Sequence, residues 1–202
     1  MTDDDRSLRE IDPEARARAL QSLLIEEGLV TTDAVNEVIS TYEEDVGPMV
    51  GARVVAEAWT DPAFKQRLLD DGIEAVAELG VGLGDEVMEL RVVENDAETH
   101  NVVVCTLCSC YPWAVLGLPP TWYKSPAYRS RVVKEPRALL REEFDTDLPE
   151  SAEIEVWDSN SEIRYMVLPQ RPDGTEGMET DQLADLVSRN AMIGVERMGS
   201  EV

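Results

Sequence analysis

All three cysteines of this 202-residue chain lie close together, in the stretch VCTLCSCYPW. Cys105, Cys108 and Cys110 have the spacing C-x-x-C-x-C. An odd number of thiols cannot pair off completely into disulfides, and a four-thiolate zinc site would lack its fourth ligand. The spacing therefore raises the question of which metal or redox chemistry three neighbouring sulfurs can support.

The tripeptide Cys108-Ser109-Cys110 can chelate one ion in a plane, through its two thiolates and the amide nitrogens of Ser109 and Cys110. Cys105 can add a ligand from below, which leaves one position open. Zinc prefers a tetrahedron of side chains. Soft sulfurs with anionic nitrogens favour a low-spin transition ion, cobalt(III) or iron(III), which an open position makes available as a Lewis acid. On spacing alone, three reduced cysteines on a turn or a redox pair explain the cluster more simply.

The overall composition predicts one substantial domain, alone or with an appended arm, because 43% of the residues are hydrophobic. No stretch has the pattern of a signal peptide or a membrane span. Three cysteines fit a reducing compartment better than a secreted disulfide framework, so we expect a cytoplasmic protein with no membrane partner.

The net charge is −24, with 42 acidic residues against 18 basic ones. Such a surface repels phosphate backbones, so we expect no nucleic-acid partner. Salt adaptation explains such a charge, and so does a bacterial-type genome bias together with a solubilising surface. Neither indicates a catalytic activity.

The N-terminal part has the pattern of two helices, one from Pro13 to Gly28 and one capped by Thr32, ending at a break at Gly47-Pro48. Their narrow apolar stripes fit two arrangements: the helices fold back on their own domain, or they form an arm that needs another chain to bury the stripe. We take the second as the expectation, an arm over residues 1–47 that contacts a partner subunit. A domain over residues 48–202 follows. It should begin with a helix at about residues 50–59 and another opened by Asp61-Pro62.

Beyond Gly80 the period of hydrophobic residues changes to two, which predicts strands at residues 88–93 and 101–105. Residues 117–126 should form a rigid loop, and helices should open at Ser125-Pro126 and at Pro136. Strands EIEVWD and EIRYMVLPQRP follow, and Thr180 should cap a last helix. This order predicts an α+β fold: a helical arm, then a layered α/β sandwich-like domain carrying the cysteine loop.

His100 is the only histidine. On a straight strand it shares a face with Val102 and Val104, opposite Cys105. We expect an exposed or structural residue, and neither a metal ligand nor a catalytic base.

The stretch VCTLCSCYPWAVLGLPPTWYKSPAYRSRVV resembles the metal-binding α subunit of nitrile hydratase, and the metal-bearing subunit of thiocyanate hydrolase shares the motif. The resemblance continues through GARVVAEAWTDPAFKQRLLDD upstream. Downstream it includes EIEVWDSNSEIRYMVLPQRPDGTEG and LADLVSRNAMIGV. It covers most of the chain from Pro48 to Val195.

The resemblance implies that Cys105 is the axial thiolate, and that Cys108, Cys110 and the amide nitrogens of Ser109 and Cys110 are equatorial ligands. It implies a sulfinate at Cys108 and a sulfenate at Cys110, with Cys110, Cys108 and Ser109 forming the catalytic centre. A threonine at position 106 and a tyrosine at position 111 match the cobalt type, so non-corrin Co(III) is expected, with Fe(III) the alternative ion.

Further positions match residues near the family's site. Trp113 resembles a tryptophan that lines the substrate pocket, and Asp158, Glu162 and Arg164 match a set linked to hydrogen bonding and proton relay. Many family members carry a glutamine before the first strand, where this chain has Glu86 nearby and no glutamine.

The implied reaction is hydration of a nitrile to an amide, with the ion acting as Lewis acid. No arginine lies within the motif, and in the family arginines of a β subunit contact the oxidised sulfurs. We therefore expect an obligate α/β heterodimer that can double to a heterotetramer. The sequence leaves open whether an activator protein loads the cobalt. Thiocyanate hydrolysis is the alternative reaction, and a metal or redox module without catalytic activity is the alternative class.

Overall fold

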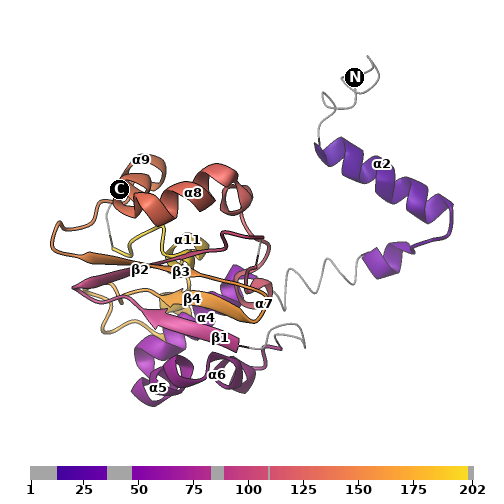
Figure 1. Cartoon of the computed structure of the whole chain (residues 1–202). Coiled ribbons are helices and arrows are strands. Elements are labelled where there is room, and N and C mark those ends of the chain that lie inside the picture. Colours follow the sequence, from indigo (N-terminus) through magenta and orange to yellow (C-terminus); the bar gives the residue numbers. More distant parts are fainter. Residues whose placement is uncertain (1–12, 36–46, 83–88, 109, 200–202) are drawn as a thin grey trace. The chain divides into compact units, whose positions relative to one another are not determined.

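The computed structural model describes residues 13–35, 47–82, 89–108 and 110–199 (Figure 1). The chain divides into two compact units, Met1–Glu44 and Asp45–Val202.

The first unit contains helix α2, Pro13–Glu26, which begins at the expected proline. A second helical stretch begins at residue 32, but its cap is not the expected Thr32. The hydroxyl of Thr31 instead accepts a hydrogen bond from the amide of Ala34 at 3.1 Å. Leu20 and Leu23 of α2 are 59% and 57% exposed. No described helix is both long enough and apolar enough to cross a bilayer.

The second unit opens with three helices: α4 (Pro48–Thr60), α5 (Pro62–Asp70) and α6 (Gly72–Glu78). Pro48 begins α4, because a proline at the first helical position sacrifices no intrahelical hydrogen bond. The Asp61 carboxylate caps α5 as predicted, accepting from the amide of Ala63 at 2.8 Å. Asp71 caps α6 in the same way, and this short helix was not predicted from the sequence.

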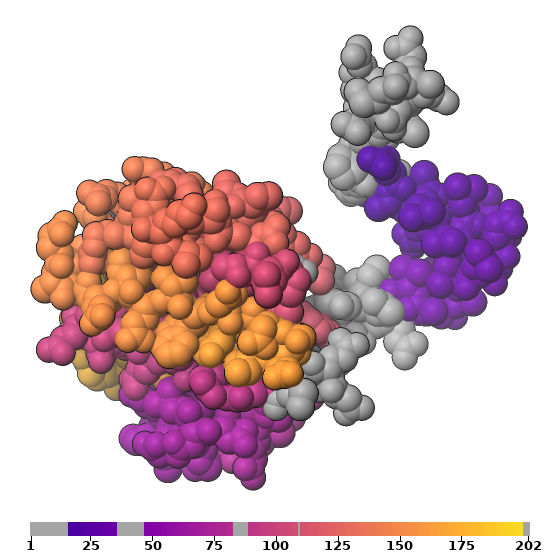
Figure 2. Space-filling model, in the orientation of Figure 1, coloured from indigo at the N-terminus to yellow at the C-terminus, as the bar shows by residue number. Residues whose placement is uncertain are grey.

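Among the described residues, four strands form two parallel pairs. Strand β1 (Glu89–Glu94) pairs with β4 (Ile163–Leu168), and β2 (Thr99–Val104) pairs with β3 (Glu153–Asp158). Figure 2 shows the magenta and orange segments in contact on one face, although they are far apart in the sequence. The predicted strands are therefore correct, while their parallel pairing was not predicted.

The remaining helices surround these strands. They are α7 (Trp113–Leu116), the 3₁₀ turn η2 (Thr121–Lys124), α8 (Pro126–Lys134), α9 (Pro136–Phe144), α10 (Thr180–Ala184) and α11 (Arg189–Ile193). The predicted loop 117–126 thus contains a 3₁₀ turn. Thr180 is the first residue of α10 and not its cap, and α10 is not the last helix. The residue before it, Glu179, donates its amide to Gln182 Oε1 at 3.0 Å.

In Figure 1 the strands lie between α8 and α9 on one side and α5 and α6 on the other. Helices α5 and α6 pack against β1, and α9 packs against β3. Side chains of both strand pairs form the core between these helices, and Val102, Val104 and Met166 are completely buried. The α+β class and the layered arrangement predicted from the sequence are confirmed.

Two glycines allow close approaches to the elements that come before and after the cysteine loop. A Cβ on Gly51 of α4 would lie 2.7 Å from Met192 Sδ and 2.9 Å from the Val115 carbonyl of α7. Gly194 has a φ of 87°, and a Cβ there would lie 1.9 Å from the Asn101 carbonyl of β2. Larger residues would therefore displace the segments on either side of the cysteine loop.

His100 is buried, with 5% of its surface exposed, so the expected structural position is correct and the exposed alternative is wrong. With its proton on Nε2, the ring donates to the Gly194 carbonyl at 2.8 Å and accepts from Asn95 Nδ2 at 3.3 Å. Burial lowers the pKa of His100, and the nearby charges of Arg197 and Arg137 lower it further, against the raising effect of the Gly194 carbonyl.

This lowered pKa predicts a pH dependence of stability. In the unfolded chain His100 has an ordinary pKa of 6.5, and in the folded chain its pKa is lower. Between the two pKa values the unfolded form therefore binds a proton that the folded form does not. The contribution of His100 is therefore present above pH 6.5 and is lost as the pH falls toward the folded pKa. His100→Gln should lower the free energy of unfolding by about 1–3 kcal/mol at neutral pH. Its stability in urea should fall less on mild acidification than that of the original chain, and an equal fall would contradict this assignment.

Candidate metal centre

The cysteine loop, residues 105–110, begins where strand β2 ends. The carboxyl ends of parallel strands share one edge of a sheet, and Val104 at the end of β2 stands opposite Asp158 at the end of β3. Asp158 accepts two hydrogen bonds from Thr106, one from its amide at 2.9 Å and one from its hydroxyl at 2.6 Å. Asp158 therefore anchors the start of the loop.

The loop brings the three sulfurs together. The Sγ atom of Cys108 lies 3.2 Å from that of Cys105 and 2.9 Å from that of Cys110, and all three lie within 4.8 Å of one another. The amide of Cys108 also points at the Cys105 sulfur, at 3.3 Å. Cys105 is buried, Cys110 is half-buried and Cys108 is exposed. Ser109 lies outside the described residues.

The Cys108 thiol lies within hydrogen-bonding distance of both other sulfurs. Burial, followed by the hydrogen bond with Cys108, raises the pKa of the Cys110 thiol to about 12, while the positive charge of Arg164 acts in the opposite direction. Metal ligands are thiolates, so binding of an ion by this loop must release protons.

Side chains from distant elements hold the carbonyls around the loop. Arg129 Nη1 of α8 donates to the Cys108 carbonyl at 3.1 Å, and the Tyr123 hydroxyl of η2 donates to the Cys110 carbonyl at 3.1 Å. The Tyr128 hydroxyl donates to the Val103 carbonyl at 2.7 Å. None of these three residues was predicted from the sequence. All three lie in the quoted stretch that carries the family resemblance, and the helix start at Ser125-Pro126 places residues 128 and 129 in the first turn of α8.

The other residues singled out in the sequence come from different elements. Arg164 of β4 donates to the Asn160 carbonyl, and its charge acts on Cys110. Trp113 is the first residue of α7 and is 40% exposed. Glu162 is exposed in the turn before β4. Glu86 lies outside the described residues.

Tyr111 follows the last cysteine and is buried, with its ring edge toward that of Tyr123 at a centroid distance of 5.0 Å. Burial raises the pKa of its hydroxyl, and the charge of Arg189 partly opposes this. Within the described residues this hydroxyl has no hydrogen-bond partner. Tyr111 therefore packs behind the loop as a neutral side chain.

The outer surface of the loop is apolar as well as accessible. Leu107, between the first two cysteines, is 87% exposed, and Leu118 after α7 is 63% exposed. Trp113 is 40% exposed, so apolar side chains reach solvent both within the loop and in the segment that follows it.

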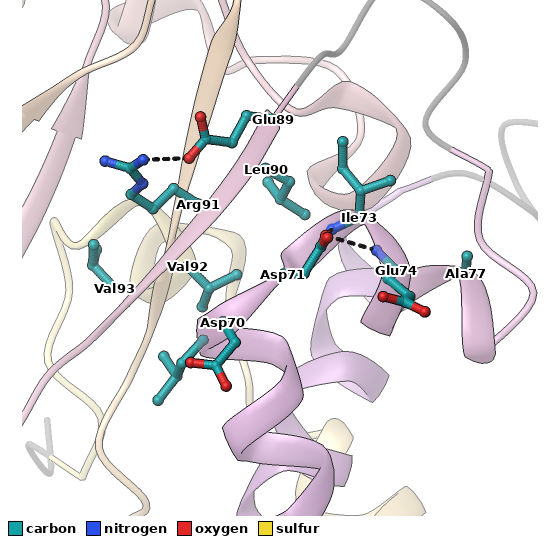
Figure 3. A pocket seen from close by; sticks show the side chains of 11 residues that line it. Asp70, Asp71, Ile73, Glu74, Ala77, Glu89, Leu90, Arg91, Val92 and Val93 are labelled. Atoms are coloured by element: carbon teal, nitrogen blue, oxygen red, sulfur yellow. Dashed lines mark hydrogen bonds and ion pairs between the residues drawn. The ribbon is translucent and has the colours of Figure 1, made fainter.

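A cavity of about 680 Å³ lies between α5, α6 and β1, and none of the described cysteines lines it (Figure 3). Its acidic side chains have structural roles or face solvent. Figure 3 shows the Asp71 carboxylate accepting from the amide of Glu74, as the cap of α6, and Glu89 paired with Arg91. The cysteine loop, by contrast, gathers groups that are typical metal ligands.

The donor set fits a transition-metal ion. The three sulfurs are soft ligands, and they lie close enough together to bind one ion. Their spacing leaves no fourth cysteine for the tetrahedral thiolate site that zinc prefers.

Comparisons with known proteins agree on one family. The family described as nitrile hydratase, alpha chain, matches residues 11–196. The chain is 60% identical to the cobalt-containing nitrile hydratase subunit alpha of Pseudonocardia thermophila, over 90% of this chain and 89% of that protein. It is 43% identical to thiocyanate hydrolase subunit gamma of Thiobacillus thioparus, over 91% of this chain and 79% of that protein.

The fold is similar to that of a double mutant of the Fe-type nitrile hydratase from Comamonas testosteroni Ni1. The TM-score is 0.83 at 43% sequence identity, and the similarity covers 94% of this chain and 93% of that one.

Because Asp158 is hydrogen-bonded to Thr106, its removal should destabilise the fold, and removal of the nearby Glu162 side chain should not. Asp158→Ala removes both acceptors and leaves the Thr106 amide to water, so the free energy of unfolding of the metal-free chain should fall by about 1 kcal/mol. Glu162→Ala, in the exposed turn between β3 and β4, should leave that free energy unchanged. Urea unfolding monitored by tryptophan fluorescence measures both variants, and equal stability of the two would contradict the anchoring role of Asp158.

Proposed function

This chain belongs to the nitrile hydratase α-chain family, and we propose that it is the metal-bearing subunit of an enzyme that hydrates nitriles to amides. The observation that carries this proposal is the approach of the Cys105, Cys108 and Cys110 sulfurs to within 4.8 Å of one another.

We assign the metal as low-spin, non-corrin cobalt(III). Cys105 would bind it from the buried side, and Cys108, Cys110 and the amide nitrogens of Ser109 and Cys110 would complete the set. The cobalt assignment is supported by Thr106 and Tyr111, and by the cobalt named for the Pseudonocardia thermophila relative. When bound, the ion supplies a Lewis acid that polarises a nitrile or a water molecule.

We further propose that an external oxidant, such as molecular oxygen, converts Cys108 to a sulfinate and Cys110 to a sulfenate, while Cys105 keeps a bare sulfur. The exposure of the three residues supports this order, because oxidation of cysteine follows access as well as thiolate character. Cys108 is exposed, Cys110 is intermediate and Cys105 is buried. The number of added oxygens proposed for each residue thus rises with its exposure.

Residues around the sulfurs would then orient the reactants. The partly exposed indole of Trp113 offers an apolar wall for the organic part of a nitrile. Arg164 provides a positive charge that favours an anionic oxidised sulfur at Cys110. Asp158 holds Thr106, and with it the start of the loop, through two hydrogen bonds. Glu162 is exposed next to this edge and would relay protons with them.

A β subunit is the partner we propose, forming an α/β heterodimer that can double to a heterotetramer. Two exposed apolar surfaces support an interface, each in its own unit of the chain. One comprises Leu107 in the cysteine loop and Leu118 after α7, and the other comprises Leu20 and Leu23 on α2. We also propose that α2 is part of an arm, residues 1–47, that contacts this subunit, and that the complex acts in the cytoplasm. An activator protein that delivers cobalt would need the same exposed loop.

The reaction is tested on the purified complex of this chain with its β subunit, produced in the presence of cobalt. Acrylonitrile should be converted to acrylamide, detected by chromatography, and thiocyanate should not be consumed. Product from thiocyanate alone would reject the nitrile proposal in favour of the alternative reaction, for which the 43% identity to thiocyanate hydrolase subunit gamma is the motive.

The metal centre is tested separately, by elemental analysis and by the intact mass of the chain. We expect about one cobalt per chain, because the described cysteines form one cluster, and oxygen atoms added to Cys108 and Cys110. Cys110→Ser should lose most of the cobalt and at least a thousandfold of the activity, on the order of the contribution of a group that acts directly in catalysis. Zinc bound by unmodified cysteines would contradict the proposed centre.

A further inference from the structure

Arg129 reaches the cysteine loop from α8, 21 positions further along the chain, and its Nη1 donates to the Cys108 carbonyl at 3.1 Å. Its neighbours fix its place. Ser125 Oγ caps the helix by accepting from the amide of Tyr128 at 3.1 Å, and the Tyr128 hydroxyl binds the Val103 carbonyl at 2.7 Å. We propose that Arg129 is a positioning residue of the metal centre, one that stabilises the loaded cysteine loop through the Cys108 carbonyl.

The chemistry of the peptide group makes this carbonyl special. The carbonyl of Cys108 and the amide nitrogen of Ser109 belong to the same peptide, and resonance couples the two. When that nitrogen binds an ion as an anion, part of its negative charge resides on the carbonyl oxygen. A guanidinium is always cationic, and its hydrogen bond to a charged oxygen is roughly twice as strong as a neutral one. Arg129 therefore stabilises the loaded loop more than the empty one.

A second carbonyl of the loop provides a contrast. The Cys110 carbonyl is coupled to the nitrogen of Tyr111, which is not in the proposed ligand set. It receives a hydrogen bond from the neutral hydroxyl of Tyr123 at 3.1 Å. The cation is thus at the peptide that would carry charge, and the neutral donor is at the peptide that would not.

The charge balance of the surroundings supports the same role. Sulfur and amide anions together outnumber the positive charges of a trivalent ion, and Asp158 adds a carboxylate at the start of the loop. The net charge of the whole chain is −24, so the chain as a whole does not offset this negative charge. Arg164 acts on Cys110 and Arg129 contacts Cys108. Arg129 also keeps a buried Nε without a hydrogen-bond partner among the described residues, which is a poor arrangement for stability alone.

This inference rests on the proposed function only in that the loop binds an ion, so its test measures the ion and not turnover. The cobalt-loaded complex with the β subunit is prepared with Arg129→Gln, which removes the charge, and with Arg129→Lys, which keeps it. Arg131→Gln is the matched control. It lies on the same helix and removes a cation that is paired with Glu135, Glu142 and Glu143, all of them outside the loop.

Two readouts are followed for each complex: the rate of cobalt loss to a strong chelator and the position of the sulfur-to-cobalt charge-transfer absorption. Arg129→Gln should lose cobalt about 10–100-fold faster, the usual effect of removing a residue that supports a metal ligand, and its absorption band should shift. Arg129→Lys should fall between Arg129→Gln and the original protein. Arg131→Gln should match the original protein in both readouts.

Wild-type cobalt retention and an unshifted band in Arg129→Gln would overturn the proposal, as would equal losses in Arg129→Gln and Arg131→Gln. If Arg129→Gln does not fold, the test rests on Arg129→Lys. A folded Arg129→Lys complex that retains no cobalt would then overturn the proposal as well. Cobalt binding without nitrile hydration would reject the proposed function and leave this test intact. A wild-type complex that binds no cobalt would reject both.

Discussion

The parallel pairing of β2 with β3 is the constraint on which the centre depends. It sets the end of one strand beside the end of another, so that Val104 faces Asp158 and the chain leaves the sheet beside a carboxylate. The two hydrogen bonds to Thr106 then turn the backbone into the loop. The sulfurs are close together because of their spacing in the sequence, but the direction in which the loop points is decided by this pairing.

One side of the cysteine loop is buried and the other is exposed, as expected for a site completed by a second molecule. The core side of the loop is closed by Cys105, Tyr111 and Tyr123, which are almost completely buried. The other side presents Leu107 and Cys108 to water. One half of the surroundings of an ion would thus come from this chain. The other half is open to whatever substrate or subunit arrives, which fits a family whose members are named as subunits.

Local sequence signals predicted the elements well where a single residue controls the backbone. Pro13, Asp61 and Ser125 each mark a helix start that the structure confirms, and EIEVWD matches β3 residue by residue. The two misplaced caps, at Thr32 and Thr180, are adjacent to the true ones, because neighbouring polar side chains compete for the same free amides. Long-range contacts gave no such signal. The burial of His100 and the reach of Arg129 depend on Gly194 and on the path of α8.

The distance in sequence between Thr106 and Asp158 has a kinetic consequence. These residues are 52 positions apart, and contacts of such long range form slowly, because a large loop must close before it is stabilised. The cysteines can approach one another early in folding because they are close in sequence. The hydrogen bonds between Thr106 and Asp158 that anchor their loop form only when the central strands have assembled. A metal ion that needs this shape would then be retained only by chains that have finished folding, so the metal content of a preparation would report the fraction of correctly assembled chains.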